Sequence, residues 1–183
     1  MANRLTVIAG PTAVGKGTVI KYILEHYPDV KLSVSATTRA PRPGEVDGVS
    51  YHFLTMDEFD ANIAAGKMLE YAVVHGANKY GTLREPVEAA LAAGQQLILE
   101  IDLQGARQVK LAMPEANLIF IAPPSWDELV HRLTGRGTES AEEQARRLET
   151  AKEELAAKSE FDHVVINDEV AECARRIVEL MQA

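Results

Sequence analysis

The chain has 183 residues, a length that fits one compact unit with a core of its own. Its formal net charge of −8 argues against binding nucleic acid along the whole surface, and its single cysteine excludes both an internal disulfide and a cysteine-rich zinc site. No apolar run is long enough to span a membrane, and no signal-peptide pattern precedes the first apolar segment. We therefore expect a cytoplasmic protein with no membrane partner.

The first segments predict a strand, a glycine-rich loop and a helix in immediate succession. An apolar run at 4–9 predicts the strand. The loop comprises Gly10, Pro11, Thr12, Ala13, Val14, Gly15, Lys16, Gly17 and Thr18. One face of the helix that follows carries Val19, Ile20, Ile23, Leu24 and Tyr27. This order of elements is the setting that a phosphate-binding P-loop needs.

The loop has the chemistry of a triphosphate site. Its glycines let backbone N–H groups converge on phosphate oxygens, and the helix adds the positive end of its dipole. Lys16 supplies a charge for the outer phosphates. Gly17 stands where the full pattern has a Ser or Thr that holds Mg²⁺, and Thr18 follows it, so we assign no protein ligand to a metal. A tight turn with a surface lysine is the alternative.

Residues 36–82 predict a small β-rich insertion. Strand-like pieces at 51–54 and 68–74 flank one helix near 56–65. Within the insertion, Arg39 and Arg42 lie three residues apart in a turn stiffened by prolines. A guanidinium binds phosphate through two parallel hydrogen bonds, so this turn fits a second anion site.

Two interpretations of the arginine turn remain open from the residues alone. Tyr51 and Tyr80 can each add a hydroxyl donor to an anion clamp. A solvated basic turn that pairs with Glu45 and Asp47 is the alternative. The separate P-loop favours the clamp, because one triphosphate site and one further anion site together indicate transfer of a phosphoryl group to a phosphorylated acceptor.

The rest of the chain alternates strand-like and helical segments. Apolar runs at 31–35, 96–101, 117–122 and 163–167 predict further strands, several of them covered on both faces. This alternation predicts a three-layer α/β fold with a parallel sheet. Capping boxes are predicted for Thr55 with Glu58, Thr82 with Glu85, Ser125 with Glu128, and Ser140 with Glu143. Cys173 falls on the buried face of the last helix.

A long polar helix from Glu139 to Lys158 has few apolar residues, which is typical of a weakly anchored lid. We therefore divide the chain into three parts. They are a core of residues 1–35, 83–133 and 160–183, an insertion of residues 36–82, and a lid of residues 134–159.

Seven motifs together resemble the guanylate kinases. They are residues 33–45, the set Gly48, Tyr51, His52 and Phe53, the pair Leu69 and Glu70, and residues 80–82, 100–105, 121–125 and 132–139. The resemblance runs from about residue 4 to 168. It implies a P-loop NTPase core with a nucleotide-monophosphate-binding insertion and a helical lid. It also implies a reversible reaction of ATP and GMP to ADP and GDP, with Mg²⁺ carried by ATP.

The resemblance also implies a role for each matching residue. The GMP phosphate would meet Arg39, Arg42, Tyr51 and Tyr80, and the guanine would meet Ser35, Glu70, Thr82 and Asp102. The catalytic set would be Lys16, Arg39, Arg136 and Arg147. ATP would be held by residues 10–18 and, near its adenine, by Arg132, Asn167 and Asp168.

The chemistry of guanine agrees with the role of Glu70. Guanine presents N1–H and an exocyclic amine side by side, and one carboxylate can accept from both. Adenine has an acceptor at N1, so it would leave a buried Glu70 unpaired. A lone acid that points to solvent is the alternative for this residue.

No strong general base is needed, because the attacking atom is already an anionic phosphate oxygen. Catalysis then consists of positioning and of neutralising charge with Lys16, arginines and Mg²⁺. Three other functions are weighed: a kinase for AMP or UMP, a protein-binding module without catalysis, and an ATP-driven nucleic-acid protein. Acceptance of dGMP and the oligomeric state stay open.

Overall fold

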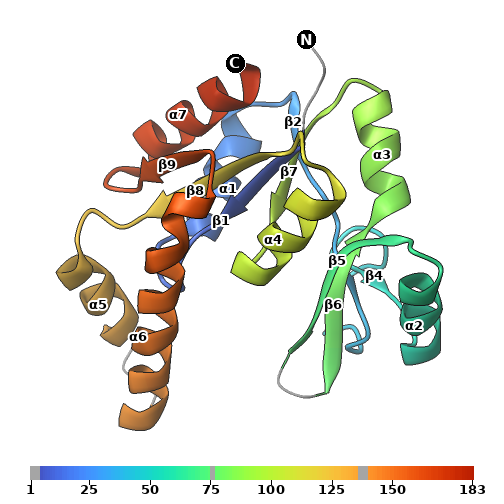
Figure 1. The fold of residues 1–183 in the computed structure, drawn as a ribbon, viewed down its shortest axis with the longest axis horizontal. Helices are drawn as coiled ribbons and strands as arrows, with labels where there is room; N and C mark the ends of the chain where they lie inside the picture. The colour runs from blue at the N-terminus through green and yellow to red at the C-terminus, as the bar shows by residue number, and fades with distance from the viewer. Residues whose placement is uncertain (1–4, 75–76, 136–139) are drawn as a thin grey trace.

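The computed structural model describes residues 5–74, 77–135 and 140–183, and its centre is a parallel sheet (Figure 1). Five strands lie in the order β2-β7-β1-β8-β9. Their bounds are β1 Thr6–Ala9, β2 Val30–Leu32, β7 Gln96–Glu100, β8 Asn117–Ala122 and β9 His163–Ile166. The predicted α/β fold with a parallel sheet is confirmed.

Apolar side chains cover both faces of the sheet, which is why its central strands are apolar nearly throughout. On one face, Ile8 and Ile119 pack with α1 (Lys16–His26) and α7 (Val170–Gln182). On the other face, Val7 packs with α3 (Arg84–Ala92) and α4 (Leu103–Ala112). The helices thus form the outer two of three layers (Figure 1).

The position of β1 places the glycine-rich loop at the middle of the sheet. Its neighbours are β7 on one side and β8 on the other, while the chain goes from α1 to the far edge strand β2. The strand order therefore reverses at β1. Ligands of open α/β sheets bind at the carboxyl ends of the strands at such a reversal, and this is where residues 10–15 lie.

A second, smaller sheet accounts for the predicted insertion. Its strands β3 (Ala36–Thr37), β4 (His52–Phe53), β5 (Met68–Val74) and β6 (Asn78–Leu83) lie in the order β4-β3-β6-β5. Helix α2 (Met56–Ala64) packs on it through Phe59, which is fully buried. The sequence did not predict β6, because its residues Asn-Lys-Tyr-Gly-Thr-Leu lack an apolar run.

The polar segment forms a helix close to its predicted bounds. Helix α5 (Trp126–Thr134) precedes it, and α6 (Ala141–Ala156) continues into a 3-10 turn at Ala157–Glu160. The expectation of weak anchoring is wrong for its second half. Ala151 is fully buried, and Leu155 packs against the core clusters on both sides of the sheet.

Three further expectations differ from the structure. Thr82 does not cap a helix with Glu85, because α3 begins after Leu83 and Thr82 lies in β6. Leu24 is 36% exposed rather than part of the buried face of α1. The strand predicted at 31–35 ends at Leu32.

The structure confirms the other three predicted helix N-caps and the burial of Cys173. Thr55, Ser125 and Ser140 each cap a helix by accepting from the backbone N–H of Glu58, Glu128 and Glu143. Cys173 is buried in α7, and burial raises its pKa to about 11. Within the described parts of the chain, no helix has the length and apolar character needed to cross a membrane.

Candidate active site

The glycine-rich loop turns sharply between β1 and α1, and two glycines allow it. Gly10 has a φ of 154°, and a Cβ there would lie 2.4 Å from the carbonyl oxygen of Ile121. Gly15 has a φ of 95°, and a Cβ there would lie 2.7 Å from Nδ2 of Asn167. Side chains at these positions would clash with fixed neighbours, so the loop requires glycine.

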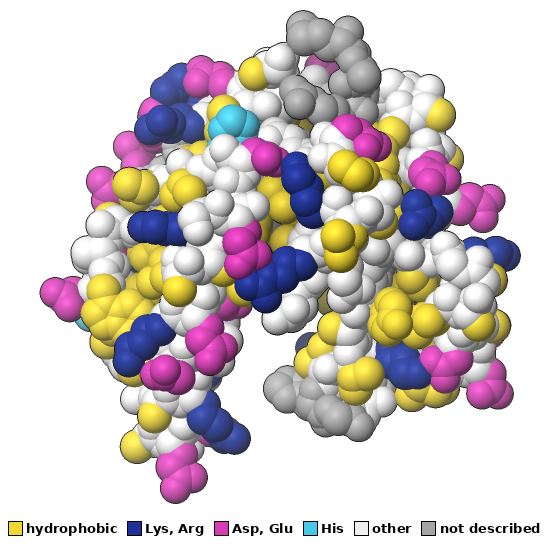
Figure 2. Space-filling view, viewed as in Figure 1, with side chains coloured by type: hydrophobic (Ala, Val, Ile, Leu, Met, Phe, Trp, Pro, Cys, Tyr) yellow, Lys and Arg dark blue, Asp and Glu magenta, His cyan; other side chains and the backbone are white. Residues whose placement is uncertain are grey.

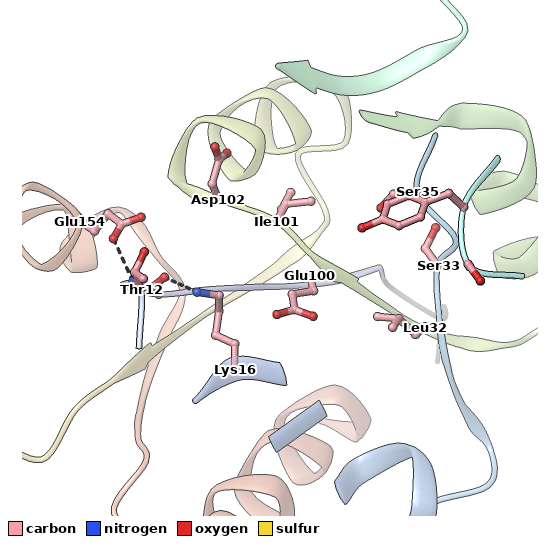
Figure 3. A pocket seen from close by; sticks show the side chains of 12 residues that line it. Thr12, Lys16, Leu32, Ser33, Ser35, Glu100, Ile101, Asp102 and Glu154 are labelled. Atoms are coloured by element: carbon pink, nitrogen blue, oxygen red, sulfur yellow. Dashed lines mark hydrogen bonds between the residues drawn. The ribbon is translucent and has the colours of Figure 1, made fainter. Parts of the chain in front are cut away.

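Lys16 is held over its own loop. Its Nζ donates to the carbonyl oxygen of Gly10 at 2.6 Å and faces that of Pro11 at 3.4 Å (Figure 3). Burial lowers the pKa of Lys16, while the nearby carboxylates of Glu154, Glu100 and Asp102 act to raise it. The ammonium is thus the one positive group facing three acids in this part of the site, as far as the described residues go.

Glu154 of α6 reaches the loop, which sequence reasoning did not foresee. Its carboxylate accepts from the backbone N–H of Thr12 at 3.4 Å (Figure 3). Burial raises the pKa of Glu154, and Lys16 opposes that shift. The helix is polar on most of its surface, so nothing in its sequence marked Glu154 as different from its solvated neighbours.

Two hollows meet at this lysine. The larger, of about 500 Å³, opens between the core and the small sheet, where Figure 2 shows the surface hollowed beside α6. Its lining includes Gly10, Thr12, Lys16, Ser33, Ser35, Ser50, Tyr51, Glu100, Asp102 and Glu154. The smaller, of about 330 Å³, lies over residues 11–18. Thr12, Lys16 and Glu100 line both hollows.

The arginine turn is an assembled cluster. Nε of Arg39 donates to the Tyr80 hydroxyl at 3.2 Å, and its terminal nitrogens donate to the Glu45 carboxylate at 3.0 and 2.9 Å. The guanidinium also lies 5.4 Å from the ring centroid of Tyr51. The hydrogen bonds to Glu45 raise the pKa of Arg39 and lower that of Glu45.

The rest of the turn is less enclosed. The backbone N–H of Arg42 donates to Glu45 at 2.7 Å, but its side chain is exposed. Of the two acids weighed as partners, Glu45 therefore pairs with Arg39. Asp47 instead accepts from the backbone N–H of Phe53 at 2.9 Å.

Glu70 is a buried acid, so the alternative of a solvent-facing side chain is wrong. Only 6% of the residue is exposed. It lies opposite Thr82 in the pairing of β5 with β6, and the Thr82 hydroxyl donates to its carboxylate at 2.7 Å. Burial raises the pKa of Glu70 to about 6, with Asp102 adding to the shift and the Thr82 bond opposing it.

Asp102 has a structural role as well as a place in the cavity. It caps α4 by accepting from the backbone N–H of Gly105 at 2.7 Å, and it lines the larger hollow. Ser35 lines the same hollow. A Cβ on Gly105 would lie 3.0 Å from Oε2 of Glu70, so glycine there makes room for the carboxylate.

The residues predicted near adenine gather at the far end of the loop. Nδ2 of Asn167 donates to the carbonyl oxygen of Val14 at 2.8 Å. Arg132 lies within 3.5 Å of the carbonyl oxygens of Val14 and Asn167, while its Nε donates to Glu128 at 2.7 Å. Asp168 is exposed in the turn after β9.

Four predicted site residues are either outside the described residues or only partly enclosed. Arg136 lies outside the described residues, and Arg147 is half-buried on α6. Gly17 and Thr18 are exposed in the first turn of α1. In the described ranges no three histidine, cysteine or acidic side chains cluster as a metal site would require.

Comparison with known proteins gives the family. The guanylate kinase family model matches residues 2–183. A guanylate kinase of Leifsonia xyli is 67% identical over 98% of this chain and 70% of its own length, and one of Nocardia farcinica is 59% identical over 97% and 93%.

Solved structures agree with the family. The crystal structure of a guanylate kinase from Anaplasma phagocytophilum is 31% identical, with a TM-score of 0.75 over 99% of this chain and 85% of that one. A shikimate kinase from Bacteroides thetaiotaomicron, at 12% identity and a TM-score of 0.52 over 98% and 99%, shares the fold alone. With its P-loop, its arginine cluster and these relatives, the chain belongs to the guanylate kinase family.

Proposed function

We propose that this chain transfers the γ-phosphoryl group of ATP to GMP, reversibly, giving ADP and GDP. The observation that supports this most is the meeting of two hollows at Lys16, one over the P-loop and the other open toward the small sheet. A donor phosphate in the first and an acceptor phosphate in the second would face each other across the lysine. Such placement supplies the entropy advantage of bringing two bound reactants together.

On the acceptor side, we assign the GMP phosphate to Arg39, Tyr51 and Tyr80, with Arg42 joining from the exposed end of the turn. In support, the side chains of Arg39, Tyr51 and Tyr80 contact one another. The guanine is assigned to Glu70 and Thr82, with Ser35 and Asp102 from the cavity wall. A buried carboxylate that lacks a matching donor is costly, which gives the site its preference for guanine over adenine.

On the donor side, the backbone N–H groups of the loop and the Lys16 ammonium hold the phosphates. Arg132, Asn167 and Asp168 are assigned to the adenine end. Lys16 then has to exchange the carbonyl of Gly10 for a phosphate oxygen. Arg136 and Arg147 are assigned to the transferred group, where they would neutralise charge on its equatorial oxygens.

Mg²⁺ would arrive with ATP. Oxygen ligands suit this ion, and Thr18 and Glu100, which both carry side-chain oxygens, line the hollow over the loop, so the residues present fit it. When bound, the ion would neutralise charge on the β- and γ-phosphates. We also propose that the protein acts in the cytosol.

An acceptor assay tests the function. Purified protein is given ATP, Mg²⁺ and one of GMP, dGMP, IMP, AMP, UMP or CMP, and ADP release is measured. We expect GMP to give the highest kcat/KM, with AMP, UMP and CMP lower by at least about a thousandfold. Equal rates with AMP and GMP would contradict guanine recognition, and ADP release that is unchanged by any acceptor would contradict transfer.

A further inference from the structure

Strand β5, which carries Glu70, lies at an edge of the small sheet. It pairs with β6 on one side, and its other side is the end of the strand order. The backbone groups on such an edge lack strand partners. The strand is also irregular next to Glu70, because the register with β6 shifts between Met68 and Glu70. A shift of register along a strand changes the direction of the side chains beside it.

A side chain of the core takes the place of a neighbouring strand at this edge. The amide of Gln108, on α4, accepts from the backbone N–H of Tyr71 at 3.0 Å and donates to its carbonyl oxygen at 3.0 Å. Both outward-facing backbone groups of the residue next to Glu70 are thereby satisfied. Only one orientation of the amide makes both bonds.

Helix α4 touches the base-reading residues through one row of positions three apart. Asp102 caps the helix and lines the cavity, Gly105 leaves room for the Glu70 carboxylate, and Gln108 binds the backbone of Tyr71. Residues at this spacing lie on neighbouring turns of one helix face. The last two residues of this row therefore meet β5 at Glu70 and Tyr71.

The same helix is part of the core. Its Ala106 and Val109 are fully buried in the cluster that contains Val7 and Leu99 of the central sheet. Leu69, the residue just before Glu70, belongs to that cluster as well. In contrast, Val73 near the far end of β5 is 58% exposed.

We propose that Gln108 is a positioning residue that fixes the carboxylate of Glu70 to the core, and so sets the selectivity for guanine. Leu69 anchors the strand before Glu70, and the Gln108 amide anchors it after Glu70. The two anchors hold this part of β5 against α4, and with it the direction of the Glu70 carboxylate. This inference rests on the role proposed for Glu70.

The decisive variant is Gln108→Met, which keeps the length of the side chain and removes both hydrogen bonds. We expect KM for GMP to rise about tenfold while KM for ATP stays within about twofold. The preference for GMP over IMP, which lacks the exocyclic amine, should fall about fivefold. Gln95→Met, in an exposed turn, is the matched control and should leave all three quantities unchanged.

Amide hydrogen exchange gives a readout that needs no activity. In the Gln108→Met variant the N–H of Tyr71 should exchange at least about tenfold faster, with little change at Val73 on the same edge. Gln108→Glu, which keeps an acceptor but opposes the Tyr71 carbonyl with an oxygen, is the second variant if the first does not fold. It should raise KM for GMP as well.

An unchanged KM for GMP and unchanged preference over IMP in these variants would overturn the proposal. So would a parallel change in kcat, KM for ATP and melting temperature, because that pattern indicates only a loss of folding. Glu70→Gln is measured alongside. If Glu70→Gln leaves KM for GMP unchanged, the proposed role of Glu70 is wrong. If Glu70→Gln raises KM for GMP but Gln108→Met does not, only the role of Gln108 is wrong.

Discussion

The two candidate anion sites of this chain differ in whether backbone or side-chain groups form them. The P-loop uses backbone, with glycines at positive φ pressed against Ile121 and Asn167. The arginine turn uses side chains, with Arg39 held by Glu45 and Tyr80. Backbone in a packed core has one arrangement, whereas a guanidinium can exchange one acceptor for another. The comparison indicates a rigid donor site and an adaptable acceptor site.

Removal of the P-loop charge should have the largest effect. In Lys16→Ala we expect kcat to fall by about a thousandfold or more, because no other described cation lines the hollow over the loop. Steady-state kinetics gives kcat, and calorimetric binding of GMP is the control, which should be nearly normal. A kcat close to that of the unaltered protein would show that Lys16 of the P-loop is not needed for phosphoryl transfer.

The second prediction concerns the adaptable site. Arg39→Ala should raise KM for GMP by about a hundredfold, since a charge-assisted bond to phosphate is lost, and should leave KM for ATP nearly unchanged. Arg39→Lys should recover part of the loss, because an ammonium supplies charge without the two parallel bonds. If Lys and Ala variants behave alike, the guanidinium geometry rather than its charge is what the acceptor requires.

Base recognition should show a smaller effect and a dependence on pH. Glu70→Gln should raise KM for GMP about tenfold at pH 8, since an amide cannot accept from both guanine donors. In the unaltered chain, kcat/KM for GMP should fall below about pH 6, where Glu70 gains a proton. The phosphate of GMP also titrates near pH 6. The quantity to measure is therefore kcat/KM for GMP of the unaltered chain divided by that of Glu70→Gln, as a function of pH.

Glu70 also links stability to pH. Because its pKa is raised on folding, the folded chain takes up a proton that the unfolded chain does not hold between pH 4.5 and 6. The free energy of unfolding therefore loses this contribution as the pH rises through 6. At pH 7 we expect Glu70→Gln to be more stable by up to about 2 kcal/mol in denaturant titrations. A less stable variant would contradict the burial cost.

The smallest effect is expected at the contact between α6 and the loop. The Glu154 carboxylate accepts from a backbone N–H of the P-loop and lies near the Lys16 ammonium. A bound phosphate would use the same N–H and the same ammonium. Glu154→Gln should lower KM for ATP by about two- to threefold, because the competing charge is removed. Glu153→Gln, exposed on the same helix, is the control. A higher KM for ATP would show that Glu154 assists binding instead.

The sequence predicted the features that depend on residues close together in the chain. The P-loop and the central strands follow from spacing and apolarity within short windows. So do two full capping boxes, at Thr55 and Ser140, and a one-sided cap at Ser125. Thr82 shows the limit of such patterns. Its spacing to Glu85 suggested a helix cap, but the hydroxyl is bound to Glu70 across a strand pair that the polar residues of β6 did not reveal.

Other parts of the site depend on partners distant in sequence. Nothing near Glu154 indicates that α6 ends against the loop, and nothing near Gln108 indicates a strand edge beside it. The arginine turn was predicted as a phosphate clamp or an ion-paired turn, and the structure shows why both patterns fitted. Arg39 is bound to Glu45 and lies beside Tyr80 and Tyr51 at once.

The bond between Asn167 and Val14 joins residues 153 positions apart, and β1 pairs with β8 from Thr6↔Asn117 onward. The P-loop is therefore synthesised well before the residue that completes its surroundings. Until Asn167 has been synthesised and has reached the sheet, the loop lacks one of the contacts that define its turn. A nascent chain would carry the signature of a nucleotide site long before it could retain a nucleotide.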